Sequence, residues 1–188
     1  MYDASLLYGV KAKAHSKILE RLHLPPGEYV LATIHRAENT DHHKAMVNIV
    51  EGLGLVAQRV DVVWPVHPRS RKLLAELPAA LRLPASLRLI EPVGYLDMRS
   101  LERNARAIVT DSGGVQKEAF FSRIPCVTVR EETEWTELVD AGWNRLCPPT
   151  SSQAIADSVA AAVGSVGREC SPYGDGHAAE RIVKGLLQ

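Results

Sequence analysis

Short runs of apolar residues alternate along the chain with longer segments in which apolar residues recur at helical spacing. Six runs have the length of strands: residues 29–34, 61–66, 87–91, 105–110, 125–129 and 144–148. Most are continuously apolar, which is typical of strands that are covered on both faces. The helix candidates are residues 4–22, 41–59, 69–76, 95–103, 114–122, 133–140, 151–163 and a last helix within 176–188.

This alternation of strand and helix predicts an α/β fold, a Rossmann-like, doubly wound parallel sheet with helices on both faces. The Pro-rich segments 24–28 and 147–152 are too short to be linkers, so we expect residues 1–188 to form a single domain. In such sheets ligands bind at the carboxyl ends of the strands, which directs attention to the loops that follow them.

The loop after the fourth predicted strand reads "DSGG" and runs into a helix. Gly113 and Gly114 let backbone N–H groups approach a ligand closely, and the N-terminus of a helix attracts phosphate. Ser112 could add a hydroxyl to such a site, or it could simply cap the helix. Glu118, one turn further on, is either a solvated carboxylate or a group that binds ribose hydroxyls.

The loop after the first predicted strand, "HRAENTD", gathers several polar types at one place. His35 and Arg36 follow the strand directly, which favours a site, although Arg36 could instead pair locally with Glu38. We expect Asn39 or Thr40 to cap the next helix. His67 follows the second strand, and we interpret it as a buried, hydrogen-bonded histidine, although it could also contribute to the site.

Arg130 follows the fifth strand, and its guanidinium can offer two parallel donors to a phosphate. Alternatively it forms an ion pair with Glu131 or Glu132. The sequence contains no G-x-G-x-x-G, Walker A, G-x-S-x-G or H-E-x-x-H motif, which removes dinucleotide dehydrogenases, P-loop enzymes, serine hydrolases and zincins. What remains is a site for a nucleotide diphosphate or a sugar nucleotide, with no reaction named.

Composition narrows the choice of partners. The formal net charge is zero, with 22 basic and 22 acidic residues, so we expect neither a nucleic acid nor an anionic membrane as partner. No apolar run is long enough to cross a bilayer, and the N-terminus lacks the pattern of a signal peptide. The three cysteines are widely spaced, which favours reduced thiols, a cytoplasmic protein and no metal site.

Several segments together resemble the C-terminal half of the non-hydrolysing UDP-N-acetylglucosamine 2-epimerases. In chain order they are "MYDA", "TIHRAEN", "PVHPR", "GYLDM", "NARAIVTDSGGVQKEA", "IPCVTVREETEWTELVDAGWN" and "YGDGHAAERI". The resemblance implies one half of a two-domain fold of the glycosyltransferase-B type, with the active site between the domains. It also implies interconversion of UDP-GlcNAc and UDP-ManNAc by elimination and re-addition of UDP, with no metal or redox cofactor.

Carried over by position, the resemblance implies that Ser112, Gly113 and Gly114 contact the diphosphate. It places Arg130 and the catalytic candidate His35 nearby, and Glu118 on the ribose hydroxyls. Met98 stands where many relatives carry an aromatic residue that packs on the uracil, so we expect weaker stacking here.

Family members have about twice this length, and their acid and base carboxylates lie mainly in the other half. We therefore expect this chain to be inactive without an N-terminal domain, which could be a separate subunit, and we expect a homodimer for the full-length family. Two other readings stay open: half of a UDP-sugar-dependent glycosyltransferase, or a non-catalytic module that binds UDP-sugars.

Overall fold

A computed structural model describes residues 1–76 and 83–187. Its centre is a sheet of six parallel strands in the order β3-β2-β1-β4-β5-β6. The strands are β1 (Tyr29–Thr33), β2 (Asp61–Pro65), β3 (Leu87–Ile90), β4 (Ala107–Thr110), β5 (Cys126–Thr128) and β6 (Asn144–Leu146). All six predicted strands are confirmed, as is the parallel α/β class.

The sheet is wound in two directions from its middle. The chain moves outward from β1 through β2 to β3, then returns to β4 on the other side of β1 and continues to β6. In the register, Val30 lies beside Val62 of β2 and Ala107 of β4. The loops that leave β1 and β4 therefore diverge, which creates a crevice at their carboxyl ends, the usual ligand position in such folds.

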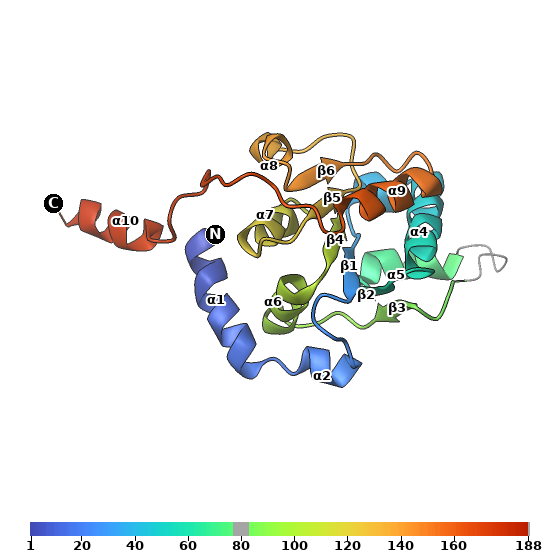
Figure 1. The fold of residues 1–188 in the computed structure, drawn as a ribbon, viewed down its shortest axis with the longest axis horizontal. Helices are drawn as coiled ribbons and strands as arrows, with labels where there is room; N and C mark the ends of the chain where they lie inside the picture. Colours follow the sequence, from blue (N-terminus) through green and yellow to red (C-terminus); the bar gives the residue numbers. More distant parts are fainter. Residues whose placement is uncertain (77–82, 188) are drawn as a thin grey trace.

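Helices cover both faces of the sheet (Figure 1). They are α1 (Tyr2–His15), α2 (Ile18–Leu22), α3 (Ala37–Thr40), α4 (His43–Ala57), α5 (Pro68–Glu76), α6 (Tyr95–Asn104), α7 (Gly113–Phe121), α8 (Thr136–Asp140), α9 (Ser152–Ala162) and α10 (Ala178–Leu186). Val30 and Ala32 pack toward α4 and α9, whereas Tyr29 and Leu31 pack toward α2, α6 and α7. The alternation of side chains along β1 thus divides the core into two layers.

Three predicted helices differ from the observed ones. The segment 4–22 is broken at Ser16, whose backbone is extended and whose hydroxyl donates to Asp97 on α6. The segment 41–59 is helical only from His43, with His42 as the N-cap of α4. Asn39 and Thr40 belong to the separate short helix α3 that precedes it, so the predicted cap at Asn39 or Thr40 was wrong. The segment 133–140 is helical only from Thr136, because the Thr133 hydroxyl turns back to accept from the Trp135 N–H.

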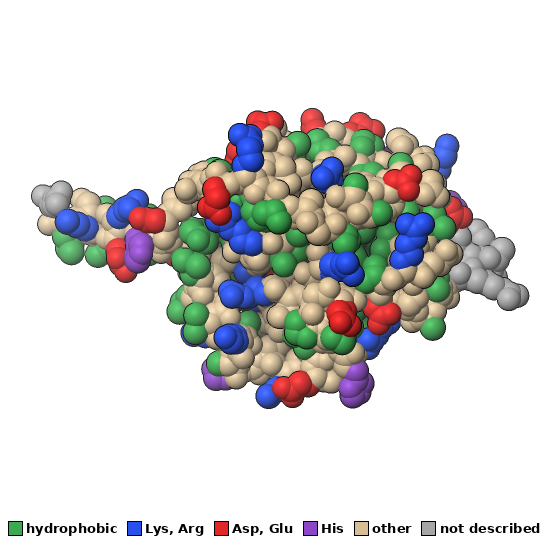
Figure 2. Space-filling model, in the orientation of Figure 1, with side chains coloured by type: hydrophobic (Ala, Val, Ile, Leu, Met, Phe, Trp, Pro, Cys, Tyr) green, Lys and Arg blue, Asp and Glu red, His purple; other side chains and the backbone are tan. Residues whose placement is uncertain are grey.

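The C-terminal helix α10 stands away from the body of the molecule, near the start of α1 (Figures 1 and 2). A hydrogen bond from the Ala179 N–H to Asp3 joins the two helices. None of the residues in α10 is buried, and its apolar side chains Ile182, Val183 and Leu186 are exposed. Gln188, at the end of the segment predicted as helix, lies outside the described residues. No helix in the described ranges is long and apolar enough to span a membrane.

We expect Gly52 to be required where α4 crosses α9. A Cβ at this position would lie 2.9 Å from both the Ser152 carbonyl oxygen and the Ile155 Cβ. Gly52→Ala should therefore lower the free energy of unfolding by about 1–2 kcal/mol in chemical denaturation, because overpacking outweighs the better helix propensity of alanine.

Gly54, two residues further along the same helix, is the matched control. A Cβ there would meet only Pro84 Cδ, at an ordinary 3.7 Å. Gly54→Ala should leave stability unchanged or raise it by up to about 1 kcal/mol. Equal effects of the two substitutions would show that the α4–α9 crossing does not depend on Gly52.

Candidate functional site

A buried carboxylate joins the loops after β1 and β4. Asp111, at the end of β4, is fully buried, and its two oxygens accept hydrogen bonds from the backbone N–H of His35 at 3.1 and 3.0 Å. Its Oδ2 also accepts from the Arg36 N–H at 2.9 Å. These bonds replace the water that Asp111 loses on burial and hold the "HRAEN" loop against the "DSGG" loop.

Asn39 extends this connection to a third strand. Its amide Nδ2 donates to Asp111 Oδ2 at 3.0 Å and to the Val129 carbonyl, just past β5, at 3.1 Å. The side chain is buried, so neither bond competes with bulk water. Asn39 is thus a loop anchor instead of the helix cap that its position in the sequence suggested.

His35 lies at the mouth of the crevice with its side chain 39% exposed. Its Nδ1 is 3.6 Å from Asp111 Oδ1, which is too long for a hydrogen bond. The ring of His67 lies beside it, with 5.6 Å between ring centroids.

The interpretation of His67 as a buried residue was wrong, because this residue is exposed at the loop after β2. Its Nδ1 accepts a hydrogen bond from the Arg69 N–H at the start of α5, which explains its orientation without burial. The structure therefore brings two histidines to the same edge of the sheet.

The "DSGG" turn begins α7. The Ser112 hydroxyl accepts from the Val115 N–H at 3.5 Å, so the serine does cap the helix. A Cβ on Gly113 would lie 3.2 Å from the Trp135 indole nitrogen, which leaves little room for a side chain. A Cβ on Gly114 would meet only Met1 Cε and Ser112 Oγ, at 3.7 and 3.8 Å. Gly114 is therefore not required by packing.

Two arginines and two glutamates form an ion-pair group beside this turn, here named the Arg–Glu quartet: Arg36, Glu38, Arg130 and Glu134. Arg130 donates to both Glu134 oxygens, at 2.9 and 3.3 Å, and its Nε donates to Glu38 at 3.3 Å. Arg36 lies 3.6 Å from Glu38 and 3.7 Å from Glu134. Of the two alternatives for Arg36, the local pair with Glu38 is present.

The partners of Arg130 are not the ones expected from the sequence: Glu131 and Glu132 are exposed, and the partner is Glu134, four residues further along the same loop. The bidentate contact with Arg130 lowers the pKa of Glu134 to about 2, and the same contact raises the pKa of Arg130. Arg130 is almost wholly buried, whereas Glu38 and Glu134 are at least half exposed. Burial therefore fixes Arg130, and its carboxylate partners can move into solvent.

Glu118 is not a solvated helix carboxylate, since only 8% of the residue is exposed. Its Oε1 accepts from the Tyr95 hydroxyl at 2.8 Å and lies 3.9 Å from Nη1 of Arg99. Arg99 in turn contacts the fully buried Glu102. We refer to Tyr95, Arg99, Glu102 and Glu118 as the Glu118 cluster.

The Glu118 cluster places two carboxyl groups beside one guanidinium. Burial and the neighbouring Glu118 carboxylate raise the pKa of Glu102 well above its usual range. Burial and the hydrogen bond to Glu118 raise the pKa of Tyr95 to about 12. At neutral pH the tyrosine is therefore a hydrogen-bond donor.

The remaining sequence candidate, Met98, lies on α6 and is partly buried against the core layer that contains Ile18 and Leu101. Residues that sequence reasoning missed are Asp111, Glu134, Tyr95, Arg99 and Glu102. The only signal for Asp111 was its place between β4 and Ser112, two residues before the first glycine. Nothing in a single sequence pairs Glu102 with Glu118.

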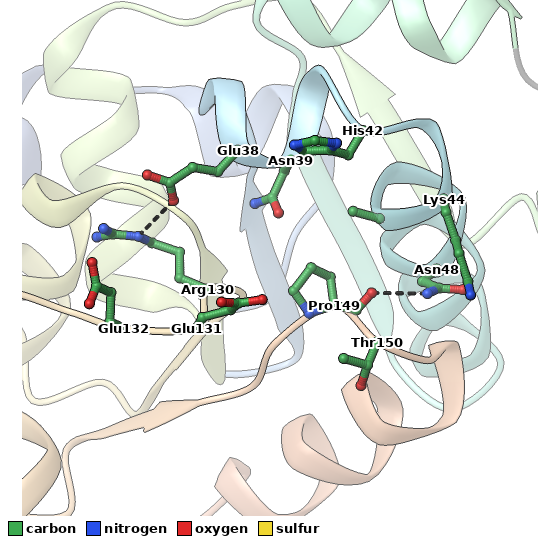
Figure 3. Close-up of a pocket in the computed structure, with 11 residues that line it drawn as sticks. Glu38, Asn39, His42, Lys44, Asn48, Arg130, Glu131, Glu132, Pro149 and Thr150 are labelled. Carbon is green, nitrogen blue, oxygen red and sulfur yellow. Dashed lines mark hydrogen bonds and ion pairs between the residues drawn. The ribbon is translucent and has the colours of Figure 1, made fainter.

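A cavity at this end of the sheet has a volume of about 860 Å³ and lies on the α4 side of the quartet (Figure 3). Glu38 and Arg130 form one wall, joined by the dashed ion pair, and Lys44, Asn48 and Thr150 lie across from them. None of residues 111–114, the "DSGG" turn, lines this cavity.

Together, the crevice can hold an anion on backbone N–H groups, with arginines beside it and a carboxylate one turn away. Among residues 1–76 and 83–187, no group of three or more His, Cys, Asp or Glu side chains is placed to hold a metal.

We expect Asp111 to be the most sensitive polar residue of the site. Asp111→Ala leaves the N–H groups of His35 and Arg36 without an acceptor, and each such loss costs about 1–3 kcal/mol. The Asn39 amide loses one of its two acceptors and keeps the Val129 carbonyl. Urea denaturation should show a loss of at least about 3 kcal/mol. Glu131→Ala, an exposed acid at the same end of the sheet, is the control and should change stability by less than about 0.5 kcal/mol. A fall of less than about 1 kcal/mol for Asp111→Ala would show that the clamp is not structural.

Comparison with known proteins places this site in a family. The sequence model of the UDP-N-acetylglucosamine 2-epimerase family matches residues 1–187. A UDP-N-acetylglucosamine 2-epimerase homolog of Methanococcus maripaludis is 49% identical over 150 residues, which covers 78% of this chain and 41% of the relative. A UDP-2,3-diacetamido-2,3-dideoxy-D-glucuronate 2-epimerase of Pseudomonas aeruginosa is 42% identical over 190 aligned residues, covering 100% of this chain and 51% of the relative.

Solved structures of epimerases have the same fold as this chain. The UDP-GlcNAc 2-epimerase of Methanocaldococcus jannaschii in complex with UDP-GlcNAc and UDP superposes with a TM-score of 0.87 and 35% identity, over 99% of this chain and 52% of that one. An E. coli heptosyltransferase shares the fold alone, at a TM-score of 0.54 and 15% identity. The chain spans about half the length of these epimerases and corresponds to their C-terminal half. It belongs to the UDP-N-acetylglucosamine 2-epimerase family.

Proposed function

We propose that this chain is the nucleotide-binding half of a non-hydrolysing UDP-N-acetylglucosamine 2-epimerase, which interconverts UDP-GlcNAc and UDP-ManNAc. The observation that carries the proposal is the Gly113–Gly114 turn at the N-terminus of α7, placed at the crevice between β1 and β4. Exposed backbone N–H groups at such a position bind phosphate, and in this family the phosphate belongs to UDP.

In this proposal the diphosphate of UDP rests on the N–H groups of residues 112–114, beside the Arg–Glu quartet. The quartet has two positive and two negative groups, so its arginines are already neutralised in the free protein. A phosphate oxygen would replace the half-exposed Glu134 on Arg130, while Arg130 itself stays in place. This exchange keeps the guanidinium paired and requires movement only of a side chain at the surface.

The reaction proposed for the family has two halves. First the proton on C2 of the sugar is removed and the C1–O bond to UDP breaks, so that 2-acetamidoglucal and UDP are formed. UDP then adds back to C1 while a proton is delivered to the opposite face of C2. The turn and the arginines stabilise the charge that develops on the departing diphosphate and retain UDP for the second half.

His35 is the catalytic candidate within this chain. It lies at the phosphate side of the crevice, held by Asp111, and we propose that it assists the departure and return of UDP. The acid and base at C2 would come from the half that this chain does not contain. Glu118 would accept the ribose hydroxyls. Met98 would contact the uracil, with weaker stacking than an aromatic ring gives.

Several properties of the whole enzyme belong to the same proposal. It uses no cofactor, and it requires a domain of the kind that precedes the matched half in the relatives, either in the same chain or as a separate subunit. The full-length protein would be a homodimer. The free cysteines Cys126, Cys147 and Cys170 fit a reducing compartment, which supports a cytoplasmic enzyme that acts on UDP-sugars and binds neither nucleic acid nor membrane.

The relative from Pseudomonas aeruginosa favours a second candidate substrate. It is 42% identical over the whole chain and is named for a diacetamido uronate. UDP is common to both substrates, and the proposed contacts of this half are to the UDP part. UDP-2,3-diacetamido-2,3-dideoxy-D-glucuronate therefore belongs in every substrate assay. A glycosyltransferase half has weaker support, since the heptosyltransferase likeness extends only to the fold.

We expect Gly114→Ala to weaken UDP binding without harming the fold. The new Cβ meets only ordinary contacts within the chain, at 3.7 Å or more, but it stands in front of the N–H groups that would hold phosphate. Calorimetry should show a loss of about tenfold or more, corresponding to about 1.4 kcal/mol. Gly185→Ala, on the exposed helix α10, is the control. UDP binding equal to that of the parent would place the phosphates elsewhere.

We also expect the isolated chain not to epimerise either substrate. Loss of a general base alone removes about 10²–10⁴ in rate, and loss of the opposite wall removes orientation and exclusion of water as well. NMR of each UDP-sugar in D2O should show no deuterium at C2 with this chain, and exchange should appear when an N-terminal domain from a relative is added. Robust exchange by the chain alone would require a base within these residues, and His35→Ala would then be the first variant to make. UDP binding without exchange even after that addition would favour a non-catalytic module.

A further inference from the structure

The Glu118 carboxylate is surrounded by a network of hydrogen bonds and ion pairs, the Glu118 cluster. Its members come from two helices, α6 and α7, and α1 contributes Ser5, which accepts from Arg99 at 2.8 Å. Only an edge of Glu118 reaches the surface, and that edge lies one turn from the Gly-Gly turn. The rest of the cluster is a support behind it.

Tyr95 makes the shortest contact that fixes Glu118. It is the first residue of α6, and its hydroxyl donates to Glu118 Oε1 at 2.8 Å. Its ring is half exposed and packs edge-on against Tyr8 of α1, with 5.3 Å between centroids and 84° between planes. The ring is therefore oriented by α1, and removal of the hydroxyl alone would leave this packing unchanged.

Arg99 is the second residue of the cluster that lies against Glu118. It is 1% exposed, contacts Glu102 through Nη1 and donates through Nη2 to Ser5 and Ser122. The same Nη1 lies 3.9 Å from Glu118 Oε1. With these partners the guanidinium cannot rotate, so it presents a constant positive charge to Glu118.

Glu102 is the second carboxyl group beside the Arg99 guanidinium. Its Oε1 has no hydrogen-bond donor among the described residues, a situation that is costly for an ionised oxygen and is relieved when that oxygen carries a proton. A neutral Glu102 can donate to the Glu118 carboxylate, and the raised pKa of Glu102 agrees with this assignment. Arg99 then balances one ionised carboxylate, Glu118.

We propose that Tyr95, supported by the buried Arg99–Glu102 pair, is a positioning residue that fixes the ionised carboxylate of Glu118 for the two ribose hydroxyls of a uridine nucleotide. The inference rests on the proposed function, which supplies the nucleotide. A free glutamate side chain would lose rotamer entropy when it binds two neighbouring hydroxyls, and the cluster removes that loss before the ligand arrives.

The test compares UDP with 2′,3′-dideoxy-UDP, which lacks both ribose hydroxyls, by calorimetry on the full chain. Tyr95→Phe should weaken UDP about three- to tenfold and leave 2′,3′-dideoxy-UDP within about twofold of the parent, because only the ribose contact is affected. In a protein that already carries Glu118→Ala, adding Tyr95→Phe should cause no further loss of UDP. Tyr8→Phe is the matched control, because it removes a hydroxyl from the adjacent ring, and it should leave both ligands within about twofold.

A purely structural role for Tyr95 would weaken both ligands equally, and that result would overturn the inference. An unchanged UDP affinity in Tyr95→Phe, an undiminished effect in the Glu118→Ala background, or equal affinity of Glu118→Ala and parent for UDP would also overturn it. If the parent chain binds no UDP, the proposed function fails first and the inference fails with it. Binding of UDP by the parent with an inert Tyr95→Phe separates the two failures.

Discussion

The organisation of the candidate site depends on the carboxylate of Asp111. This carboxylate is fully buried at the point where the sheet changes direction, and it accepts from two backbone N–H groups and one amide of the opposite loop. The order of the strands opens a crevice between β1 and β4, but it does not fix the loops that line it. Asp111 and Asn39 do so, and they thereby determine where His35 and Arg36 lie relative to the Gly-Gly turn.

Two groups of charges on either side of this clamp behave differently. The Arg–Glu quartet keeps Arg130 buried and its glutamates partly in solvent, so an incoming anion can replace a carboxylate on Arg130 without burying an unpaired charge. The Glu118 cluster is closed, and its one exposed carboxylate edge is supported from behind by Tyr95 and Arg99. The Arg–Glu quartet is suited to a ligand whose charge changes during a reaction. The Glu118 cluster is suited to neutral hydroxyl groups that must be held in one orientation.

The strands and the polar loops could be predicted because both follow from local composition. Apolar runs of strand length identified all six strands, and the "DSGG" and "HRAEN" segments were correctly placed at the carboxyl ends of two of them. Long-range pairs could not be predicted. The Asn39–Asp111 bond joins residues 72 positions apart and turned an expected helix cap into an anchor. His67 follows an apolar strand, in the segment "PVHP", and was expected to be buried. Its contacts with Arg69 and His35 hold it at the surface instead.

The central claim is that the crevice in this chain is formed in advance to receive the diphosphate of UDP. A titration of the ¹⁵N-labelled chain with UDP, followed by backbone amide NMR, tests it most directly. The account predicts that the largest shifts occur at the amides of Ser112, Gly113 and Gly114, with smaller shifts at Arg36 and Glu118 and none at the opposite ends of the strands. Shifts confined to other surfaces, or no shift at millimolar UDP, would contradict it.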